Sequence, residues 1–276
     1  MKFFKKYTLR ENIFMALVVL LSVVFMFPFY WIATGAFKPQ NVTVQIPPQW
    51  WPKNPTLQNF KQLSESPLFH WTMNSFIIAL GTMLIVCTVA TMAGFVLAKK
   101  VFPGRNLIFW SLIVAMALPK QVVMIPLFTI LSKLDWINTY QALIFPAAGW
   151  PFGVFLMKQF SQGIPGELLE AAKIDGCTEI RSFWSIVIPM VKPGIGALAI
   201  FTFINAWNDY FMQLIIIRSE KMMTLPLGVA LLQQEFTTNY GVIMAGAALA
   251  SLPMIIVFIV FQKYFTQGIT MGAVKG

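Results

Sequence analysis

Residues 167–190 read ELLEAAKIDGCTEIRSFWSIVIPM, a polar and charged stretch in a chain of 276 residues that is 58% hydrophobic and only 11% charged. Glu167, Glu170 and Ile174 follow one another at spacings of three and four residues, so a helix here presents two acids and an apolar side chain on one face. The stretch therefore predicts a short exposed helix that is suited to docking on a soluble partner.

The limits of this docking helix are also predicted by its flanking residues. Pro165 is favourable as a first helical residue, and Gly176 is a natural left-handed stop. The small side chains of Ala171 and Ala172 would allow a partner to approach closely. In an alternative interpretation, the two acids only complement the positive amino end of the helix and are solvated.

Six apolar runs are each long enough to cross about 30 Å of hydrocarbon, which takes roughly 20 helical residues. They lie near residues 13–35, 71–97, 107–131, 140–157, 194–217 and 241–261. The charged fraction is also far below the quarter or so that is typical of soluble domains. The chain is therefore predicted to be an all-α integral membrane protein with six transmembrane helices.

The basic residues are divided unequally between the two ends of these spans. With the N terminus in the cytoplasm, thirteen Lys and Arg residues lie inside and six outside. This excess fits the positive-inside rule, and an even number of spans returns the C terminus to the cytoplasm. The formal net charge of +10 does not indicate nucleic-acid binding, because the basic residues do not gather on one face.

Proline interrupts both the spans and the loop between the first two of them. A proline in a helix removes a backbone donor, so the spans are expected to be kinked or locally unwound. The prolines inside predicted spans are Pro28, Pro119, Pro126, Pro146, Pro151 and Pro253. The external loop of residues 38–70 is expected to be irregular, with one short helix near residues 57–63.

Several patterns in the sequence match one known family. The pattern E-A-A, three residues, G, nine residues, I, one residue, I-P begins at Glu170 and ends at Pro189. NAWND stands at residues 205–209, LPL at 225–227 and GAVKG at 272–276. Over nearly its whole length the chain resembles the maltose-type (MalG-like) permease subunits of bacterial carbohydrate ABC importers, the binding-protein-dependent transport inner-membrane components. Only Ile188 departs from the loop pattern, where the family often has Leu.

This resemblance implies a type I ABC importer permease fold with a cytoplasmic coupling loop at residues 158–193. The residues that it assigns to ATPase coupling are Glu167, Glu170, Ala171, Ala172, Asp175, Gly176, Ile188 and Pro189. It assigns contact with an extracellular solute-binding protein to Leu225, Pro226 and Leu227, and secondary contacts with the nucleotide-binding subunits to residues 274–276. The implied partners are a MalF-like permease, two ATP-binding subunits, the solute-binding protein, a sugar substrate and membrane lipid.

The sequence offers no motif for chemistry within this chain. It has no G-x-x-x-x-G-K-[ST] phosphate loop, so ATP and Mg are expected on the partner ATPase. His70 is the single histidine and no acidic or cysteine cluster accompanies it, which leaves neither a zinc site nor a nucleophilic triad. We therefore expect a transport subunit without a cofactor, a metal or catalytic residues, and without a nucleic-acid partner.

Two charged residues, Lys120 and Asp209, fall inside predicted spans, where an unpaired charge costs several kcal/mol. Helical rises of about 20 and 22 Å place them at similar depth and would permit an ion pair. Asn205, Asn208 and Asp209 share a helical face that would line a translocation cavity, where Trp207 or a nearby aromatic could stack on a sugar ring. Alternatively, the two asparagines only join helices by hydrogen bonds.

These features predict one permease subunit of an ATP-driven, binding-protein-dependent importer of a sugar or oligosaccharide. It would work by alternating access as half of a heterodimer in the bacterial cytoplasmic membrane. Its expected parts are an N-terminal span and external loop at residues 1–70, a permease domain at 71–265 and a cytoplasmic tail at 266–276. The alternatives are an ion-coupled secondary transporter, or an ABC permease for glycerol phosphate, a polyol or another small polar solute.

Overall fold

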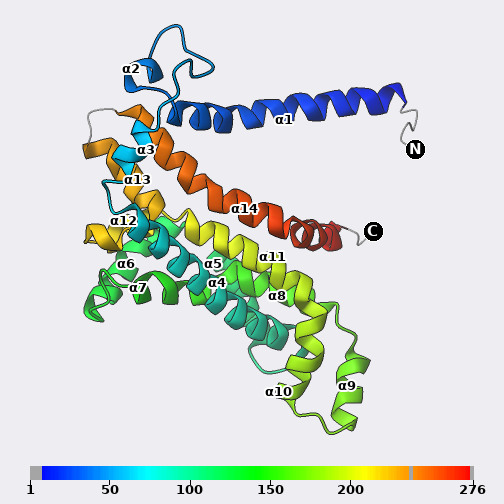
Figure 1. Cartoon of the computed structure of the whole chain (residues 1–276). Coiled ribbons are helices and arrows are strands. Elements are labelled where there is room, and N and C mark those ends of the chain that lie inside the picture. The colour runs from blue at the N-terminus through cyan, green and yellow to red at the C-terminus, as the bar shows by residue number, and fades with distance from the viewer. Residues whose placement is uncertain (1–7, 236–238, 274–276) are drawn as a thin grey trace. The chain divides into compact units, whose positions relative to one another are not determined.

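The computed structural model describes residues 8–235 and 239–273, with side chains described at residues 8–232 and 239–262. The described residues form helices joined by loops and contain no strand, which confirms the predicted all-α class (Figure 1). Residues 274–276, for which subunit contacts were predicted, lie outside the described ranges. The chain divides into two compact units, one running up to Ser66 and including Val229–Leu252, the other made of Pro67–Gly228 and the chain from Pro253 onward.

The first unit contains the predicted first span and the predicted irregular loop. Its helices are α1 (Leu9–Ala36), α2 (Gln40–Thr43), α3 (Gln58–Leu63), most of α13 (Leu225–Glu235) and the first part of α14 (Tyr240–Ala273). The short helix expected near residues 57–63 is confirmed by α3. Pro28 lies inside α1 without ending it, so the kink expected there does not interrupt the helix.

Buried polar side chains fix the end of α1 to the loop that follows it. Asn59 donates two hydrogen bonds, each 2.8 Å long, to the backbone carbonyls of Ala36 and Lys38. The Lys38 side chain is only 2% exposed, and its Nζ lies 4.2 Å from the centroid of the Trp31 ring. Burial lowers the pKa of Lys38, while the indole face gives the cation a partial substitute for water. The start of the loop is therefore held against the helix end.

The second unit contains most of the remaining helices. In chain order they are α4 (Leu68–Lys99), α5 (Arg105–Met116), α6 (Lys120–Lys133), α7 (Tyr140–Ile144), α8 (Pro151–Gln162), α9 (Gly166–Ile174), α10 (Glu179–Ser182), α11 (Ile188–Trp207) and α12 (Phe211–Ile216). Helices α4, α8 and α11 pack against one another, and α9 and α10 extend from one end of this group (Figure 1).

Glycine allows α4 and α8 to approach each other closely. A β-carbon at Gly94 of α4 would lie 2.6 Å from the backbone nitrogen of Lys158 and 2.7 Å from the carbonyl carbon of Met157. At Gly153 of α8 it would lie 3.2 Å from the β-carbon of Ala90 on α4. Small residues at such interfaces bring helix backbones into van der Waals contact, which drives helix association where no hydrophobic effect operates.

Four helices are long and apolar enough to cross a membrane singly, and two further candidates are broken. The pair α5 and α6 bends by 106° between Met116 and Lys120, which confirms the interruption that proline predicts for the span at residues 107–131. Pro119 stands at this break, because a proline cannot donate the helical hydrogen bond that would continue α5. The count of six spans stays a prediction that treats each broken pair as one span.

Two other predicted spans also differ from straight helices. A 3-10 helix, Phe145–Gly149, separates α7 from α8 with a bend of 44°, and it contains Pro146. The span expected at residues 194–217 instead begins within a continuous helical run and ends at Trp207, before the separate helix α12. A π-helical segment, Phe183–Val187, joins α10 to α11. Pro189 therefore lies within the first turn of α11 rather than before a span.

Replacing Gly94 with Ala is expected to destabilise the protein by about 1–3 kcal/mol, because the new methyl group would press on the backbone of α8. Thermal unfolding in detergent would measure this loss. Gly166→Ala is the matched control, since a β-carbon there meets nothing within 4 Å. Equal melting temperatures for the two variants would contradict the close contact of α4 and α8.

Candidate functional site

Two short helices carry the polar stretch that opened the sequence analysis. We refer to residues 165–182, which include α9 and α10, as the handle. Pro165 is the residue before α9, one position earlier than expected, and Gly176 has the predicted left-handed conformation with φ 74°. The amide of Gly176 donates to the carbonyl of Lys173, and that of Cys177 to Ala172. This pair of bonds is a Schellman motif, which ends α9 sharply and turns the chain into α10.

The handle is fixed to the membrane helices by a lysine at the end of α4. Lys99 Nζ donates to the carbonyl of Gln162 at 3.2 Å and to that of Ile164 at 2.5 Å. These carbonyls belong to the end of α8 and the turn after it, where no helical partner is available. The ammonium group therefore closes the end of α8 and sets the position from which the handle starts.

Apolar contacts support the base of the handle. Ile164 is 3% exposed, and Leu169 packs against the same core cluster as Phe183, whose ring centroid lies 5.6 Å from that of Phe95 on α4. Ala172 is 6% exposed. The expectation that Ala172 faces a partner is therefore wrong, because its methyl group points inward.

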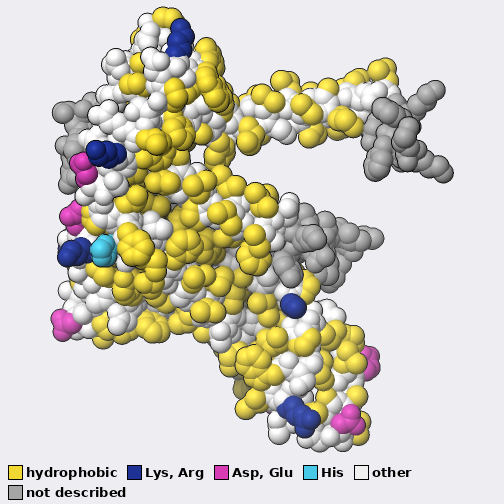
Figure 2. Space-filling model, in the orientation of Figure 1, with side chains coloured by type: hydrophobic (Ala, Val, Ile, Leu, Met, Phe, Trp, Pro, Cys, Tyr) yellow, Lys and Arg dark blue, Asp and Glu magenta, His cyan; other side chains and the backbone are white. Residues whose placement is uncertain are grey.

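The outer face of the handle carries most of the predicted coupling residues. Glu167, Glu170, Ala171, Asp175 and Gly176 are all exposed. Acidic and basic side chains lie among hydrophobic ones on the surface at the tip of the handle (Figure 2).

The apolar residue of the handle and the two predicted coupling residues in α11 differ in exposure. Ile174 is 86% exposed, so an apolar contact stands beside the acids as predicted. Of the last two predicted coupling residues, Pro189 is exposed and Ile188 is half-buried.

The two predicted coupling acids, Glu167 and Glu170, belong to no ion pair within the ranges that the structure describes. The one ion pair among the described residues joins Lys100 and Glu179 at 2.5 Å, with side chains 39% and 69% exposed. Such an exposed pair is worth at most about 1 kcal/mol. Glu167 and Glu170 take no part in it, so their carboxylates are presented to solvent.

A second group of polar contacts holds residues 217–225, which we call the 217–225 segment. Side chains from α4 and from the turn before α7 bind its backbone directly. From α4, Trp71 Nε1 donates to Glu220 O at 2.9 Å, and Asn74 Nδ2 donates to Lys221 O at 2.7 Å and to Met223 O at 2.8 Å. Ser75 Oγ, also on α4, accepts from Leu225 N at 2.8 Å. Before α7, Asn138 Oδ1 accepts from Arg218 N at 2.9 Å and from Ser219 N at 3.1 Å. An irregular segment is thereby held in one conformation.

The same contacts correct the predicted site for the solute-binding protein. Leu225 and Leu227 are 2% and 1% exposed, so neither side chain can meet a docking partner. Pro226 between them is half-buried. The exposed side chains of the 217–225 segment belong instead to Arg218, Glu220 and Lys221.

A cavity of about 670 Å³ lies within the second unit. It is lined by the three helix interruptions: Leu118 and Lys120 at the first, Gly149 and Trp150 at the second, and residues 208–210 at the third. Irregular backbone at membrane depth is tolerated where it lines a water-filled cavity. The broken spans therefore border a cavity in the same unit as the handle, whose largely apolar wall carries a few polar side chains.

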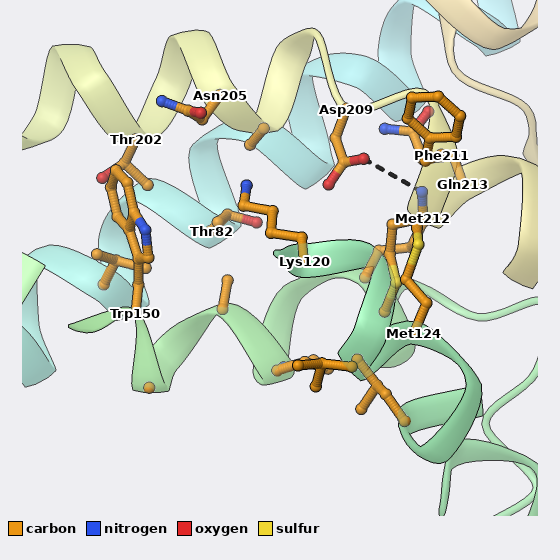
Figure 3. Close-up of a pocket in the computed structure, with 18 of the residues that line it drawn as sticks. Thr82, Lys120, Met124, Trp150, Thr202, Asn205, Asp209, Phe211, Met212 and Gln213 are labelled. Atoms are coloured by element: carbon orange, nitrogen blue, oxygen red, sulfur yellow. Dashed lines mark hydrogen bonds between the residues drawn. The ribbon is translucent and has the colours of Figure 1, made fainter. Parts of the chain in front are cut away.

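Four of the polar residues that the sequence analysis singled out at membrane depth line this cavity. Lys120, Asn205, Asn208 and Asp209 all line it, which agrees with the shared face predicted for the three residues of the fifth span. Lys120 extends between α11 and the broken helices, and Asp209 Oδ1 accepts from the amide of Met212 at 3.2 Å (Figure 3). Asp209 and Lys120 form no ion pair, and the 106° break invalidates the equal depth calculated along a straight helix.

The aromatic prediction for the cavity is wrong in one residue. Trp207 is 1% exposed and stacks on Phe203 with a centroid distance of 5.7 Å, away from the cavity. Trp150 takes its place, because it lines the cavity and is half-buried (Figure 3). The Trp150-Pro151 pair marks a helix break, and that signal could have identified it in the sequence.

Sequence reasoning missed two further groups of residues. It read Lys99 only as a topogenic charge, and it did not single out Asn74, Asn138 or Thr82. Asn138 has φ 62°, a left-handed conformation that asparagine tolerates in turns, so its place three residues after Asp135, before α7, was a usable signal. Nothing local distinguishes Thr82 from the other hydroxyl residues of α4.

Apolar helices, a cavity between broken helices with polar side chains in its wall, and an exposed polar handle are features of a membrane transport subunit. Residues 90–271 match the family of binding-protein-dependent transport system inner membrane components, and the chain belongs to this family. The family identifies it as a multi-pass protein of the bacterial cell membrane and a transport permease subunit.

Named relatives cover almost the whole chain. The arabinooligosaccharides transport system permease protein AraQ of Bacillus subtilis is 37% identical over 262 residues, which are 94% of this chain and 93% of that protein. The trehalose/maltose transport system permease protein MalG of Thermococcus litoralis is 30% identical over 264 residues, or 94% of each chain. The resemblance to maltose-type permeases is thereby confirmed.

A solved structure confirms the type of fold. A chain in the crystal structure of a bacterial ABC transporter involved in the import of the acidic polysaccharide alginate superposes with a TM-score of 0.77 at 21% identity. The match covers 95% of this chain and 100% of that chain. The predicted ABC importer permease fold is therefore correct.

Replacing Lys99 with Met is expected to loosen the handle. Hydrogen bonds to a charged group are worth about 1.5–3 kcal/mol, so the α9 amides should exchange with solvent roughly tenfold faster or more. Hydrogen exchange measured by mass spectrometry would detect this change. The adjacent variant Lys100→Met removes the exposed ion pair with Glu179 and the contact of Nζ with the Phe95 ring at 5.8 Å, but no hydrogen bond to the root of the handle. Equal exchange in both variants would contradict the role of Lys99.

Proposed function

We propose that this chain is one permease subunit of an ATP-driven importer for a sugar or oligosaccharide. The observation that carries the proposal is the cavity among broken helices, with polar side chains in its wall, in a chain whose named relatives transport arabinooligosaccharides and trehalose or maltose. Saccharide hydroxyls need both donors and acceptors, and the cavity offers the side chains of Lys120, Asn205 and Asp209. Trp150 supplies an apolar face of the kind on which a sugar ring packs.

The driving energy is proposed to come from a separate pair of ATP-binding subunits that hold ATP and Mg. The exposed acids Glu167 and Glu170 and the apolar Ile174 give the handle a surface that fits a cleft with basic and apolar walls. The short, sharply terminated α9 would move as one body with such a cleft. Lys99 would pass that motion to α4, because the same ammonium group contacts the root of the handle.

Orientation and assembly follow the same proposal. The handle and both termini would lie in the cytoplasm, as the positive-inside rule predicts. A MalF-like permease would complete the heterodimer, and the permease domain at residues 71–265 would carry the transport pathway. Closure of the ATPase pair would then favour a cavity open to the outside, and hydrolysis would return the cavity to the cytoplasm.

A solute-binding protein is proposed to dock on the side of the 217–225 segment. This segment presents the charged side chains of Arg218, Glu220 and Lys221 on a backbone that α4 holds in place. A preorganised surface loses little conformational entropy on binding. Thr224 Oγ1 also donates to Gln213 Oε1, and Gln213 lines the cavity, so docking at the segment has a direct route to the cavity wall.

Reversing the charge of Glu170 is expected to abolish transport. In Glu170→Lys the handle would meet a basic cleft with a like charge, so the ATPase should no longer copurify and ATP-dependent sugar uptake into vesicles should fall at least tenfold. Glu65→Lys makes the same change at an exposed acid of the first unit, outside the handle, and should behave like wild type. Unchanged uptake in Glu170→Lys, or uptake without ATP, would contradict the coupling and favour an ion-coupled transporter.

Charge reversal on the 217–225 segment tests the second docking surface. The double variant Arg218→Glu, Lys221→Glu should reduce stimulation of ATP hydrolysis by the cargo-loaded binding protein several-fold. The effect should weaken at high salt, because exposed charges are screened beyond about 10 Å at 0.1 M salt. Lys133→Glu is the control at an exposed lysine outside the segment. Full stimulation of the double variant would exclude this surface.

A further inference from the structure

One hydroxyl group of α4 differs from all the others on that helix. Thr72, Ser75, Thr88 and Thr91 each donate to the backbone carbonyl four residues earlier, at distances between 2.6 and 2.9 Å. This is the usual way in which a hydroxyl is satisfied inside a membrane helix. Thr82 Oγ1 makes no such bond and has no hydrogen-bond partner in the described part of the chain, although the residue is only 5% exposed.

The position of Thr82 makes this unpaired hydroxyl costly. It lies on the inward stripe of α4 between Ile78 and Val86, both of which are buried. An apolar residue of the same shape would avoid the cost of burying an unpaired hydroxyl, which is about 1–3 kcal/mol. Packing alone therefore gives no reason for a threonine here.

Thr82 lines the cavity together with the polar residues of the opposite helices. Figure 3 draws it among the side chains around the cavity, with Lys120, Asn205 and Trp150. Asn205 Nδ2 donates to the carbonyl of Phe201 at 2.8 Å, which leaves Oδ1 as the acceptor of this amide. A ligand held here would therefore meet a donor at Lys120, an acceptor at Asn205 and an aromatic wall.

The charges that line the cavity favour a neutral ligand. Lys120 and Asp209 are the charged residues among its described lining, and their formal charges cancel. An anion attracted by Lys120 would be repelled by Asp209, whereas hydroxyl groups can donate to the carboxylate and accept from the ammonium. Uncharged polyhydroxyl compounds use both groups at no electrostatic cost.

We propose that Thr82 is a cargo-contacting residue, whose hydroxyl forms a hydrogen bond with a hydroxyl of a neutral saccharide in the cavity of this subunit. The inference rests on the proposed function as an importer and adds to it the direct participation of this subunit in cargo recognition. Rotation about χ1 by one staggered step moves the hydroxyl to the position that the methyl group held, so the hydroxyl can turn toward cargo in the cavity.

The test uses this chain reconstituted in proteoliposomes with its partner permease, ATPase and binding protein. Uptake of radiolabelled arabinotriose, maltose, trehalose and an alginate trisaccharide is measured at saturating binding protein. Thr82→Val should lower the maximal uptake of a neutral sugar by about threefold to tenfold, the value of one hydrogen bond, and Thr82→Ser should restore it. Thr91→Val, a buried α4 threonine outside the cavity lining, is the matched control and should transport like wild type.

Thermal unfolding separates a binding role from a structural one. Thr82→Val should unfold at the same temperature as wild type or higher, because it removes an unpaired buried hydroxyl. Lower uptake in a protein of undiminished stability supports the proposal.

Two outcomes overturn the proposal while the proposed function stands. In the first, Thr82→Val takes up neutral sugars as well as Thr91→Val does. In the second, the wild type takes up the alginate trisaccharide but none of the neutral sugars. If wild type imports none of these sugars, the proposed function itself fails and the inference falls with it.

Discussion

The second unit depends on the close approach of α8 to the backbone of α4. At Gly94 there is no room for a β-carbon, since the main chain of α8 already occupies its place. In a membrane, apolar side chains gain nothing by leaving lipid for protein, so helices are held together by van der Waals contact and short polar bonds. The glycine contact supplies the first of these, and α4 also packs against α7 and α11.

The 217–225 segment, the cavity and the handle meet this one helix at three levels. Trp71, Asn74 and Ser75 at its start hold the 217–225 segment, Thr82 reaches the cavity, and Lys99 at its end holds the root of the handle. With 32 residues, α4 is about 48 Å long. Its backbone is hydrogen-bonded internally, so it can shift as a rod but cannot easily bend. A displacement of α4 at either end would therefore also move Thr82 in the cavity wall.

The cavity exists because neighbouring helices are interrupted where α4 is continuous. Pro119 and Pro146 stand at two of the interruptions, and the chain between α11 and α12 forms the third. Each break frees backbone groups that lipid cannot satisfy, so the breaks have to face polar surroundings. Because the three breaks line one shared cavity, their backbone groups need not face lipid. The polar side chains of Lys120, Asn205 and Asp209 line the same cavity.

The sequence by itself determined the class of the protein, the left-handed stop at Gly176 and the shared face of Asn205, Asn208 and Asp209. Composition, glycine conformation and helical periodicity are local properties, so they can be read along the chain. Only the tertiary structure decided that Trp207 turns inward while Trp150 faces the cavity, and that Leu225 is buried.

The tertiary structure likewise decided that Thr82, alone among the hydroxyls of α4, lacks a partner. It also decided how sharply the chain turns at Pro119, which made a straight-helix estimate of depth fail. These outcomes depend on which surfaces face each other across the unit. Such contacts join residues far apart in the chain, and no local pattern encodes them.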